Sequence, residues 1–424
     1  MKGKKLLTLV GLCLVAALVL PLLPACTEPA PEKYIILGAP LSLGYPDGIC
    51  AKDNFELAID EINDAGGVTV GAVNYKFKLE SGDTRDLEPG ASLEQALAVV
   101  EYLLTSKDAD FIIGGPIRSD IALSAMDLAS QYETVFLWSA GFLSPSYGPK
   151  VAGDYEKYKY CFRTQGSAVP QAGECVALLE QIAADEGLAK EAYIMCQQVS
   201  HAIGAANGIK TGLEDAGWTV HGPDQIPTGT INFDANLLAA NATGAPFLVP
   251  WFDMPESTNL IKQWYDWSLP MIPVGFVVPG NDALAWNTFG GKCEYLVDQY
   301  PKAGITPINS QAIHYIDLYK AEINPAGPAE TWVGPVCYQA VYILKEALES
   351  AGSLDADDVI AALEAMDSVG VYGRIKFDAD HDMTCSQDPD TGAISTWVQW
   401  IDGERVNVYP EVVKTADVVL PPWM

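Results

Sequence analysis

Short apolar runs alternate along the chain with segments in which apolar residues recur every three or four positions. Residues 34–39, 110–113 and 247–250 are runs of the first kind, which is typical of buried parallel strands. Residues 53–65 and 93–104 have the second pattern, which predicts helices with one apolar face. Strands that alternate with helices of about 10–15 residues predict a parallel sheet with helices on both faces.

This alternation occurs twice. The first series predicts strands at 34–39, 75–80, 110–113 and 135–138, and helices at 53–65, 93–104 and 121–132. The second follows a strand at 160–164 and predicts strands at 192–196, 218–221, 247–250 and 271–276, and helices at 171–186, 202–216 and 256–267. Two series predict two similar lobes. Ligands of open α/β sheets bind beyond the carboxyl ends of the strands, so we expect a site in the cleft between the lobes.

The N-terminal segment has a different pattern. Three lysines precede an apolar run at residues 6–23, and Cys26 follows it. This order predicts an export signal at residues 1–25. The segment resembles a bacterial lipoprotein signal, which implies a lipid on Cys26 and a Pro-rich tether at residues 26–33. We expect an exported protein, periplasmic or on the outer face of the cytoplasmic membrane. A plain secretory signal is the alternative.

Composition excludes several classes of function. The chain has 424 residues, which suggests two domains, and its formal charge of −30 disfavours nucleic acid as a partner. The four histidines are far apart and show no zinc spacing. The acidic segment 378–389 lacks the Gly and Glu of a calcium-binding EF-hand loop, so we expect a turn there. No cofactor motif and no nucleophile elbow are found, and we expect no cofactor, no metal and no enzymatic activity.

Seven cysteines remain after the signal and Cys26 are set aside. An odd number means that at least one is unpaired or pairs between chains. Cys161, Cys196 and Cys337 lie in apolar stretches and are predicted to be buried as small hydrophobic residues.

Several sequence words carry a resemblance to a known family. They are GAPLS at 38–42 before FELAIDEINDAGG at 55–67, SGDTRD at 81–86, FIIGGPIRS at 111–119, CFRT at 161–164 and YGRIKFD at 372–378. Together they resemble the type I periplasmic binding proteins, nearest to the branched-chain amino acid (leucine, isoleucine, valine) binding proteins of ABC importers.

The resemblance implies an α/β fold with two Rossmann-like lobes joined by a three-strand hinge. The crossings between lobes are expected near Thr164, Tyr300 and Gly373. Lobe one would then hold residues 34–164 and 301–372, and lobe two residues 165–300 and 373–424. Closure of such a hinge traps the ligand.

The resemblance also implies site residues in lobe one. These are Arg118, Ser119, Ser139, Ala140 and Gly141, in loops that contact a ligand carboxylate. Hydroxyl groups and N–H groups at helix starts favour an anion. The alternative for Arg118 is a simple ion pair with Asp120. The loop 43–48 matches a region where the family places an aromatic residue over the ligand; Tyr45 is the candidate, and Asp47 is the closer match by position.

In lobe two the resemblance points to His201, Trp251, Asp253 and Val277. His201 is either a ligand contact or a surface histidine that caps the following helix. Trp251 either lines the cleft or packs under the lobe. Val277 stands where the family has an acid that holds the ligand's ammonium group, and Asp253 or Asp47 could substitute. Otherwise the ligand has no ammonium. A disulfide of some relatives is absent, because Arg85 and Ile117 replace its cysteines.

These observations predict an extracytoplasmic substrate-binding lipoprotein of an ABC importer. It would capture a small organic solute, an amino acid, carboxylate or amide, and deliver it to the permease subunits, held at the membrane by the lipid on Cys26. Two alternatives stay open: a ligand receptor that reports to a sensor, and an exported two-lobed hydrolase.

Overall fold

The computed structural model describes residues 32–88, 90–282, 284–300, 302, 306–324 and 332–424. The predicted export signal, Cys26 and most of the predicted tether lie outside the described residues. All helices and strands named below belong to one unit, Tyr34–Met424. Among the described helices, none is long and apolar enough to cross a membrane.

The first large sheet has the strand order β2-β3-β1-β4-β5-β6. Its strands are β1 (Tyr34–Leu41), β2 (Val68–Val70), β3 (Val73–Asp83), β4 (Phe111–Gly114), β5 (Phe136–Trp138) and β6 (Cys161–Arg163). Neighbouring strands are parallel except for β2, which runs antiparallel to β3. The central strands are buried over most of their length, which explains why they appear in the sequence as continuous apolar runs.

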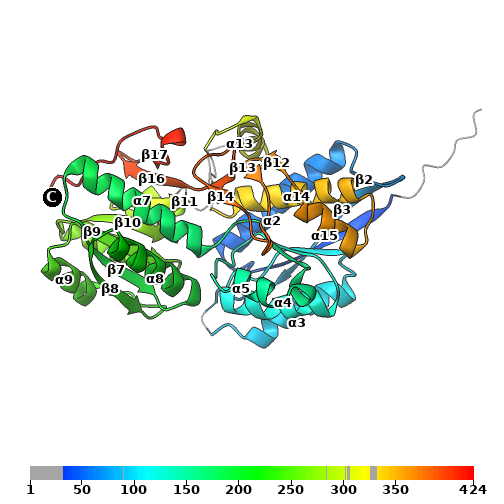
Figure 1. Ribbon diagram of the computed structural model, residues 1–424, viewed down its shortest axis with the longest axis horizontal. Helices are drawn as coiled ribbons and strands as arrows, with labels where there is room; N and C mark the ends of the chain where they lie inside the picture. The colour runs from blue at the N-terminus through cyan, green and yellow to red at the C-terminus, as the bar shows by residue number, and fades with distance from the viewer. Residues whose placement is uncertain (1–31, 89, 283, 301, 303–305, 325–331) are drawn as a thin grey trace, which may run out of the picture. The chain divides into compact units, whose positions relative to one another are not determined.

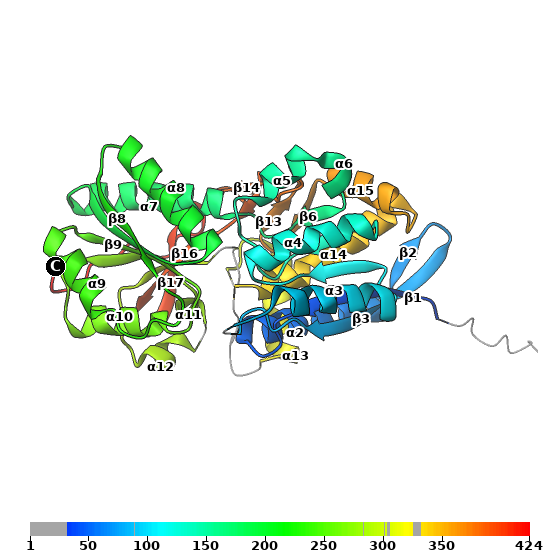
Figure 2. The ribbon, with the colours of Figure 1, turned by 90° about the horizontal axis from the view of Figure 1, so that it is seen from below.

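Helices from both ends of the chain pack around this sheet. They are α2 (Pro46–Asp64), α3 (Leu93–Ser106), α4 (Ser119–Gln131), α5 (Tyr147–Gly153), α6 (Tyr155–Tyr158), α13 (Ser310–Glu322), α14 (Gly334–Ala351) and α15 (Ala356–Glu364). α14 lies beside α2, although nearly 300 residues separate them in the sequence (Figure 2). The chain therefore returns to the first lobe after it has built the second.

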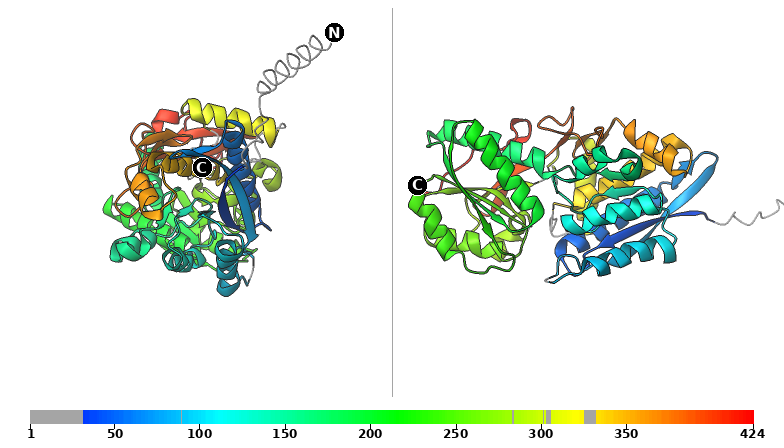
Figure 3. Two further views of the ribbon diagram at one scale, coloured as in Figure 1. Left: turned by 90° about the vertical axis from the view of Figure 1, so that its right-hand side faces the viewer. Right: turned by 60° about the horizontal axis from the view of Figure 1, so that its bottom comes forward.

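The second large sheet has the order β17-β16-β11-β10-β9-β7-β8. Its strands are β7 (Glu191–Gln197), β8 (Thr219–Ile226), β9 (Phe247–Phe252), β10 (Ile272–Val277), β11 (Val297–Tyr300), β16 (Thr396–Ile401) and β17 (Glu404–Tyr409). The first five are parallel, and β16 and β17 add an antiparallel edge (Figure 1). The helices are α7 (Ala168–Glu186), α8 (Ser200–Asp215), α9 (Asp234–Thr243), α10 (Ser257–Asp266), α11 (Val278–Asn281) and α12 (Ala285–Phe289) (Figure 3).

A small third sheet has the order β12-β13-β15-β14. Its strands are β12 (Ser368–Gly370), β13 (Gly373–Ile375), β14 (Cys385–Ser386) and β15 (Ala393–Ile394), and a 3₁₀ turn, η2 (Glu411–Val413), follows β17. The Tyr372 hydroxyl donates to the Thr164 carbonyl, and the Ile394 N–H donates to the Tyr372 carbonyl. Residues 373–394 therefore bond to segments that we assigned to lobe one, and we propose that the last crossing lies near Ser395 rather than near Gly373.

The α/β class with two parallel-rich sheets is confirmed. Two boundaries differ from the sequence prediction in ways that matter for the site. The expected loop at 43–48 is shorter, because Pro46 is well suited to the first turn of a helix and α2 begins there. β9 continues through Phe252, so Trp251 belongs to the strand and not to the loop after it. Helix α9 and the antiparallel edge were not predicted.

Candidate ligand-binding site

Arg118 lies at the start of α4, just beyond the carboxyl end of β4. Its guanidinium makes two hydrogen bonds to the Asp120 carboxylate, at 2.7 and 2.6 Å, so the alternative of an ion pair with Asp120 is what the structure shows. Its backbone N–H donates to the buried Asp86 at 2.7 Å, which fixes the loop. The Arg118 pKa is raised, mainly by the Asp120 hydrogen bond, with Asp86 and Asp253 contributing. Arg118 is thus within electrostatic range of an acid of the second lobe.

The Ser139–Gly141 loop follows β5 and is fully engaged within the protein. The Ser139 hydroxyl accepts from the Gly114 N–H at 3.1 Å, and the Ser139 N–H donates to the Gly114 carbonyl. The Gly141 N–H donates to the Gln165 side chain at 3.0 Å, and the same side chain donates back to the Gly141 carbonyl. Ala140 is buried. A rigid, internally bonded loop therefore stands where the resemblance implied ligand contacts.

Three more lobe-one residues lie near these loops. Ser119 is the first residue of α4 and is buried. Tyr45 caps α2 and Asp47 lies in its first turn, both partly exposed. Burial raises the pKa of the Cys337 thiol, and Asp47 adds to that rise, so Asp47 is near Cys337, whose thiol contacts the Ser139 carbonyl.

In the second lobe the structure brings His201 and Asp253 together. His201 is the second residue of α8, after β7, and Asp253 follows β9. The His201 Nε2 lies 3.6 Å from the Asp253 carboxylate. His201 is buried, so of the two alternatives the structure excludes the surface histidine. Burial lowers the His201 pKa, and Asp253 opposes that shift.

Gln197 holds the backbone at Asp253, and the sequence analysis missed it. Its side-chain oxygen accepts from the backbone N–H groups of Asp253, at 3.0 Å, and Met254, at 2.9 Å. Gln197 is the last residue of β7 and is buried. A polar residue that ends an otherwise apolar strand was the available signal.

Trp251 is fully buried near the end of β9, which agrees with the packing alternative. Its ring lies 5.6 Å from that of Phe276 on β10, and Phe276 contacts Trp332, which precedes α14, at 6.3 Å. These aromatic contacts connect the second sheet with a segment of the first lobe. The indole N–H groups of Trp251 and Trp332 are buried and have no hydrogen-bond partner among the described residues.

Val277 ends β10, and a buried acid lies behind it. The Val277 N–H donates to the Asp298 carboxylate at 2.8 Å, and Asn281 donates to the other oxygen at 2.8 Å. Burial raises the pKa of Asp298 well above its ordinary value. Both carboxylate oxygens therefore accept hydrogen bonds from the protein. Asp298 does not replace the acid that the family has at the position of Val277 to hold the ammonium group of the solute.

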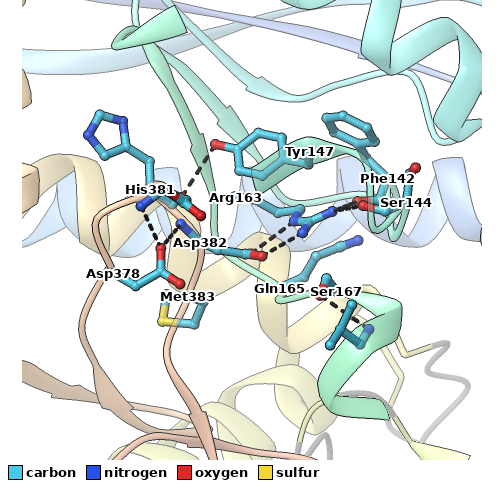
Figure 4. A network of polar contacts seen from close by, with 12 residues as sticks. Phe142, Ser144, Tyr147, Arg163, Gln165, Ser167, Asp378, His381, Asp382 and Met383 are labelled. Atoms are coloured by element: carbon cyan, nitrogen blue, oxygen red, sulfur yellow. Dashed lines mark hydrogen bonds and ion pairs between the residues drawn. The ribbon is translucent and has the colours of Figure 1, made fainter. Parts of the chain in front are cut away.

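A buried ion pair holds the first crossing between the lobes. The Arg163 side chain, at the end of β6, makes two hydrogen bonds to Asp382, at 2.9 and 2.5 Å (Figure 4). Its remaining donors reach the carbonyls of Phe142, at 2.9 Å, and Ser144, at 2.8 Å. The segment around Asp382, expected to be a turn between strands of lobe two, is instead the turn between β13 and β14 that supports this arginine.

One pocket of about 500 Å³ lies away from all these residues. Its lining includes His314, Tyr338, Tyr342 and Val369, from α13, α14 and β12. Within the described part of the chain, no group of three His, Cys, Asp or Glu side chains could hold a metal ion. Among the described residues, the seven cysteines at positions 50–385 form no disulfide, and Cys161, Cys196 and Cys337 are buried as predicted.

Comparison with known proteins agrees with this architecture. The chain matches the periplasmic binding protein family over residues 43–388. It is 23% identical over 373 residues to the Leu/Ile/Val-binding protein homolog 8 of Brucella abortus, which covers 84% of this chain and 85% of the relative.

Two solved structures share the fold. A putative branched-chain amino acid ABC transporter protein from Silicibacter pomeroyi aligns with a TM-score of 0.79 at 19% identity, over 92% of this chain and 100% of that one. An R. palustris solute-binding protein in complex with 4-hydroxybenzoate aligns with a TM-score of 0.72 at 16% identity, over 91% and 98% of the two chains. The family match covers most of the chain, and the chain belongs to the periplasmic binding proteins.

Proposed function

We propose that this chain is the extracytoplasmic solute-binding component of an ABC importer, anchored by a lipid on Cys26, and that it binds a small organic carboxylate between its lobes. The observation that carries the proposal is the placement of Arg118 and Asp253 in the two lobes. Each lies beyond the carboxyl end of a strand in a different parallel sheet, where ligands of such sheets bind, and the two are within electrostatic range.

The chemistry of the two sides favours a carboxylate. Arg118 is a partly exposed guanidinium that already forms a two-pronged contact with Asp120. A ligand carboxylate offers the same planar pair of acceptors, so it can share or replace that contact. The buried Ser119 and the first turn of α4 add donors that favour an anion.

The second lobe supports a ligand without an ammonium group. Val277 is apolar, and the acid behind it, Asp298, is buried and bonded to protein donors. Asp253 is the remaining acid, and it lies beside His201. Because Asp253 is about one-third exposed, an α-amino acid with its ammonium on Asp253 is the second candidate.

A thermal-shift screen of the protein without its signal tests the proposal. The panel contains 4-hydroxybenzoate, benzoate, aliphatic carboxylates, their amides and α-amino acids. A ligand that binds the native state raises the unfolding midpoint by mass action. We expect the largest shift with a carboxylate that has no amino group, and we expect Arg118→Ala to abolish it.

The matched control is Arg374→Ala, because Arg374 also pairs with an acid at the surface, Asp367, but lies on β13. It should leave the ligand shift unchanged. If only α-amino acids stabilise the protein, and Asp253→Asn removes that effect, the second candidate replaces the first. If no solute of the panel binds, the carboxylate proposal is wrong.

A further inference from the structure

Three chain segments connect the two large sheets, and described residues from each of them lie at one largely buried polar cluster. The segments follow β6, follow β11 and precede β16. The crossing cluster, as we call it, consists of Glu174, Gln299, Lys302, Cys385 and Ser395. It lies where any change in the angle between the lobes must bend the chain.

Glu174 is the centre of the cluster. It projects from the second turn of α7, is buried, and accepts a hydrogen bond of 2.8 Å from the side chain of Gln299 on β11. Burial raises the Glu174 pKa to about 6. Lys302 opposes that rise most strongly, followed by Gln299 and Ser395. The pKa of this carboxyl group therefore depends on residues at the end of and after β11 and on the residue before β16.

Lys302 lies against the third segment, which is the one that follows β6. Its side chain is almost fully buried, and its Nζ lies 3.2 Å from the Sγ of Cys385 on β14. A Cβ added to Gly166, which follows β6, would lie 2.7 Å from that sulfur and 3.2 Å from the Nζ. The segment after β6 thus lies directly against the ammonium and the thiol.

Among the described residues, the other titratable groups that interact with Glu174 carry no positive charge. They are Cys175 on α7, Cys385 on β14 and Tyr409 on β17, and burial raises the pKa of each. Asp382 also faces Cys385. The Lys302 ammonium therefore favours the ionised form of Glu174. It offsets the effect of burial only in part, because burial raises the Glu174 pKa more than Lys302 lowers it.

We propose that Glu174 makes the hinge responsive to external pH: loss of its proton loosens the three connecting segments, and its protonation tightens them. An ionised Glu174 regains solvation when the segments separate, and a neutral one gains nothing from opening. By linkage, acid favours the state in which the carboxyl group holds its proton more firmly, which is the buried state. The inference goes beyond solute capture, because binding between the lobes requires no titrating group at the crossings.

Hydrogen–deuterium exchange tests this without knowledge of the ligand. Peptides that cover residues 164–175 and 296–302 are followed between pH 4.5 and 8, after correction for the chemical exchange rate. We expect the opening constant to be about tenfold larger at pH 7.5 than at pH 5, which corresponds to one unit of pKa difference between closed and open states. The midpoint should lie near pH 6.

Three variants distinguish the proposed effect of Glu174 on the hinge from general effects of pH on the protein. Glu174→Gln mimics the neutral acid and should exchange slowly at every pH. Lys302→Met removes the balancing cation, so its midpoint should move above that of the wild type. Glu186→Gln changes an exposed acid at the end of the same helix and should behave like the wild type.

A wild type without pH dependence in these peptides overturns the proposal, as does a Glu174→Gln variant that retains the wild-type response. Should Glu174→Gln fail to fold, Lys302→Met decides alone: an upward shift of the midpoint supports the switch, and an unchanged midpoint overturns it.

Discussion

Two arginines of the first lobe make the same contact in opposite surroundings. Arg163 and Arg118 each bind one aspartate through two hydrogen bonds. Arg163 is 1% exposed and its aspartate is 219 residues away, whereas Arg118 is 36% exposed and its aspartate is two residues away. Burial and sequence separation thus distinguish two pairs with the same chemistry.

The difference indicates which pair holds the fold and which can serve a ligand. The Arg163 guanidinium also donates to two carbonyls, so its donors are committed to a crossing between the lobes. Removing one partner of such a buried pair leaves an uncompensated charge. Arg118 is partly solvated and its partner Asp120 is exposed, so exchanging Asp120 for a ligand carboxylate costs little.

The largest effect is expected when the buried pair is broken. Arg163→Met should lower the free energy of unfolding by about 3–5 kcal/mol, because Asp382 and two carbonyls lose their donors. Urea denaturation followed by circular dichroism measures this. Arg374→Met, which breaks an exposed pair, is the control and should change stability by less than about 1 kcal/mol. Equal losses for the two variants would contradict the comparison.

A smaller loss of stability is expected when the charge at position 163 is kept and only the shape of the side chain changes. Arg163→Lys keeps the positive charge beside Asp382 but cannot reach all four acceptors, because an ammonium lacks the planar fork of a guanidinium. We expect a loss of about 2 kcal/mol in the same denaturation experiment. A loss as large as that of Arg163→Met would mean that the shape of the guanidinium, rather than its charge, carries the stability.

The smallest effect on stability is expected at the exposed pair. Arg118→Ala should change the free energy of unfolding by less than about 1 kcal/mol, since exposed ion pairs contribute little. The same variant should lose the ligand-dependent thermal shift, so stability and binding separate at this residue. A stability loss comparable to that of Arg163→Met would show that Arg118 is structural.

Much of the architecture could be predicted from the sequence, because it depends on local patterns. Continuous apolar runs such as 247–250 and helical spacing such as 93–104 result from burial on both faces of a strand or on one face of a helix. Boundaries shifted where a local rule was overlooked, as with Pro46 at the start of α2. Predicted site residues such as Arg118 and His201 lie beyond strand ends, as the resemblance implied.

The sequence does not show which polar groups already make hydrogen bonds or ion pairs within the protein. His201 is buried beside Asp253, and Gly141 is bonded to Gln165. The spacing of these residues along the chain does not predict these contacts, because each contact depends on how separate strand ends pack together.

The alternation of strands and helices, its occurrence in two series and the family resemblance can be read from the sequence alone, since the alternation follows from periodic burial along a continuous chain. The folded structure was needed to show that Arg163 is committed to Asp382, that Asp298 is hydrogen-bonded behind Val277, and that Lys302 lies within electrostatic range of Glu174. The physical reason is that a charge or hydrogen bond depends on distance and burial, and both are set by segments far apart in the sequence.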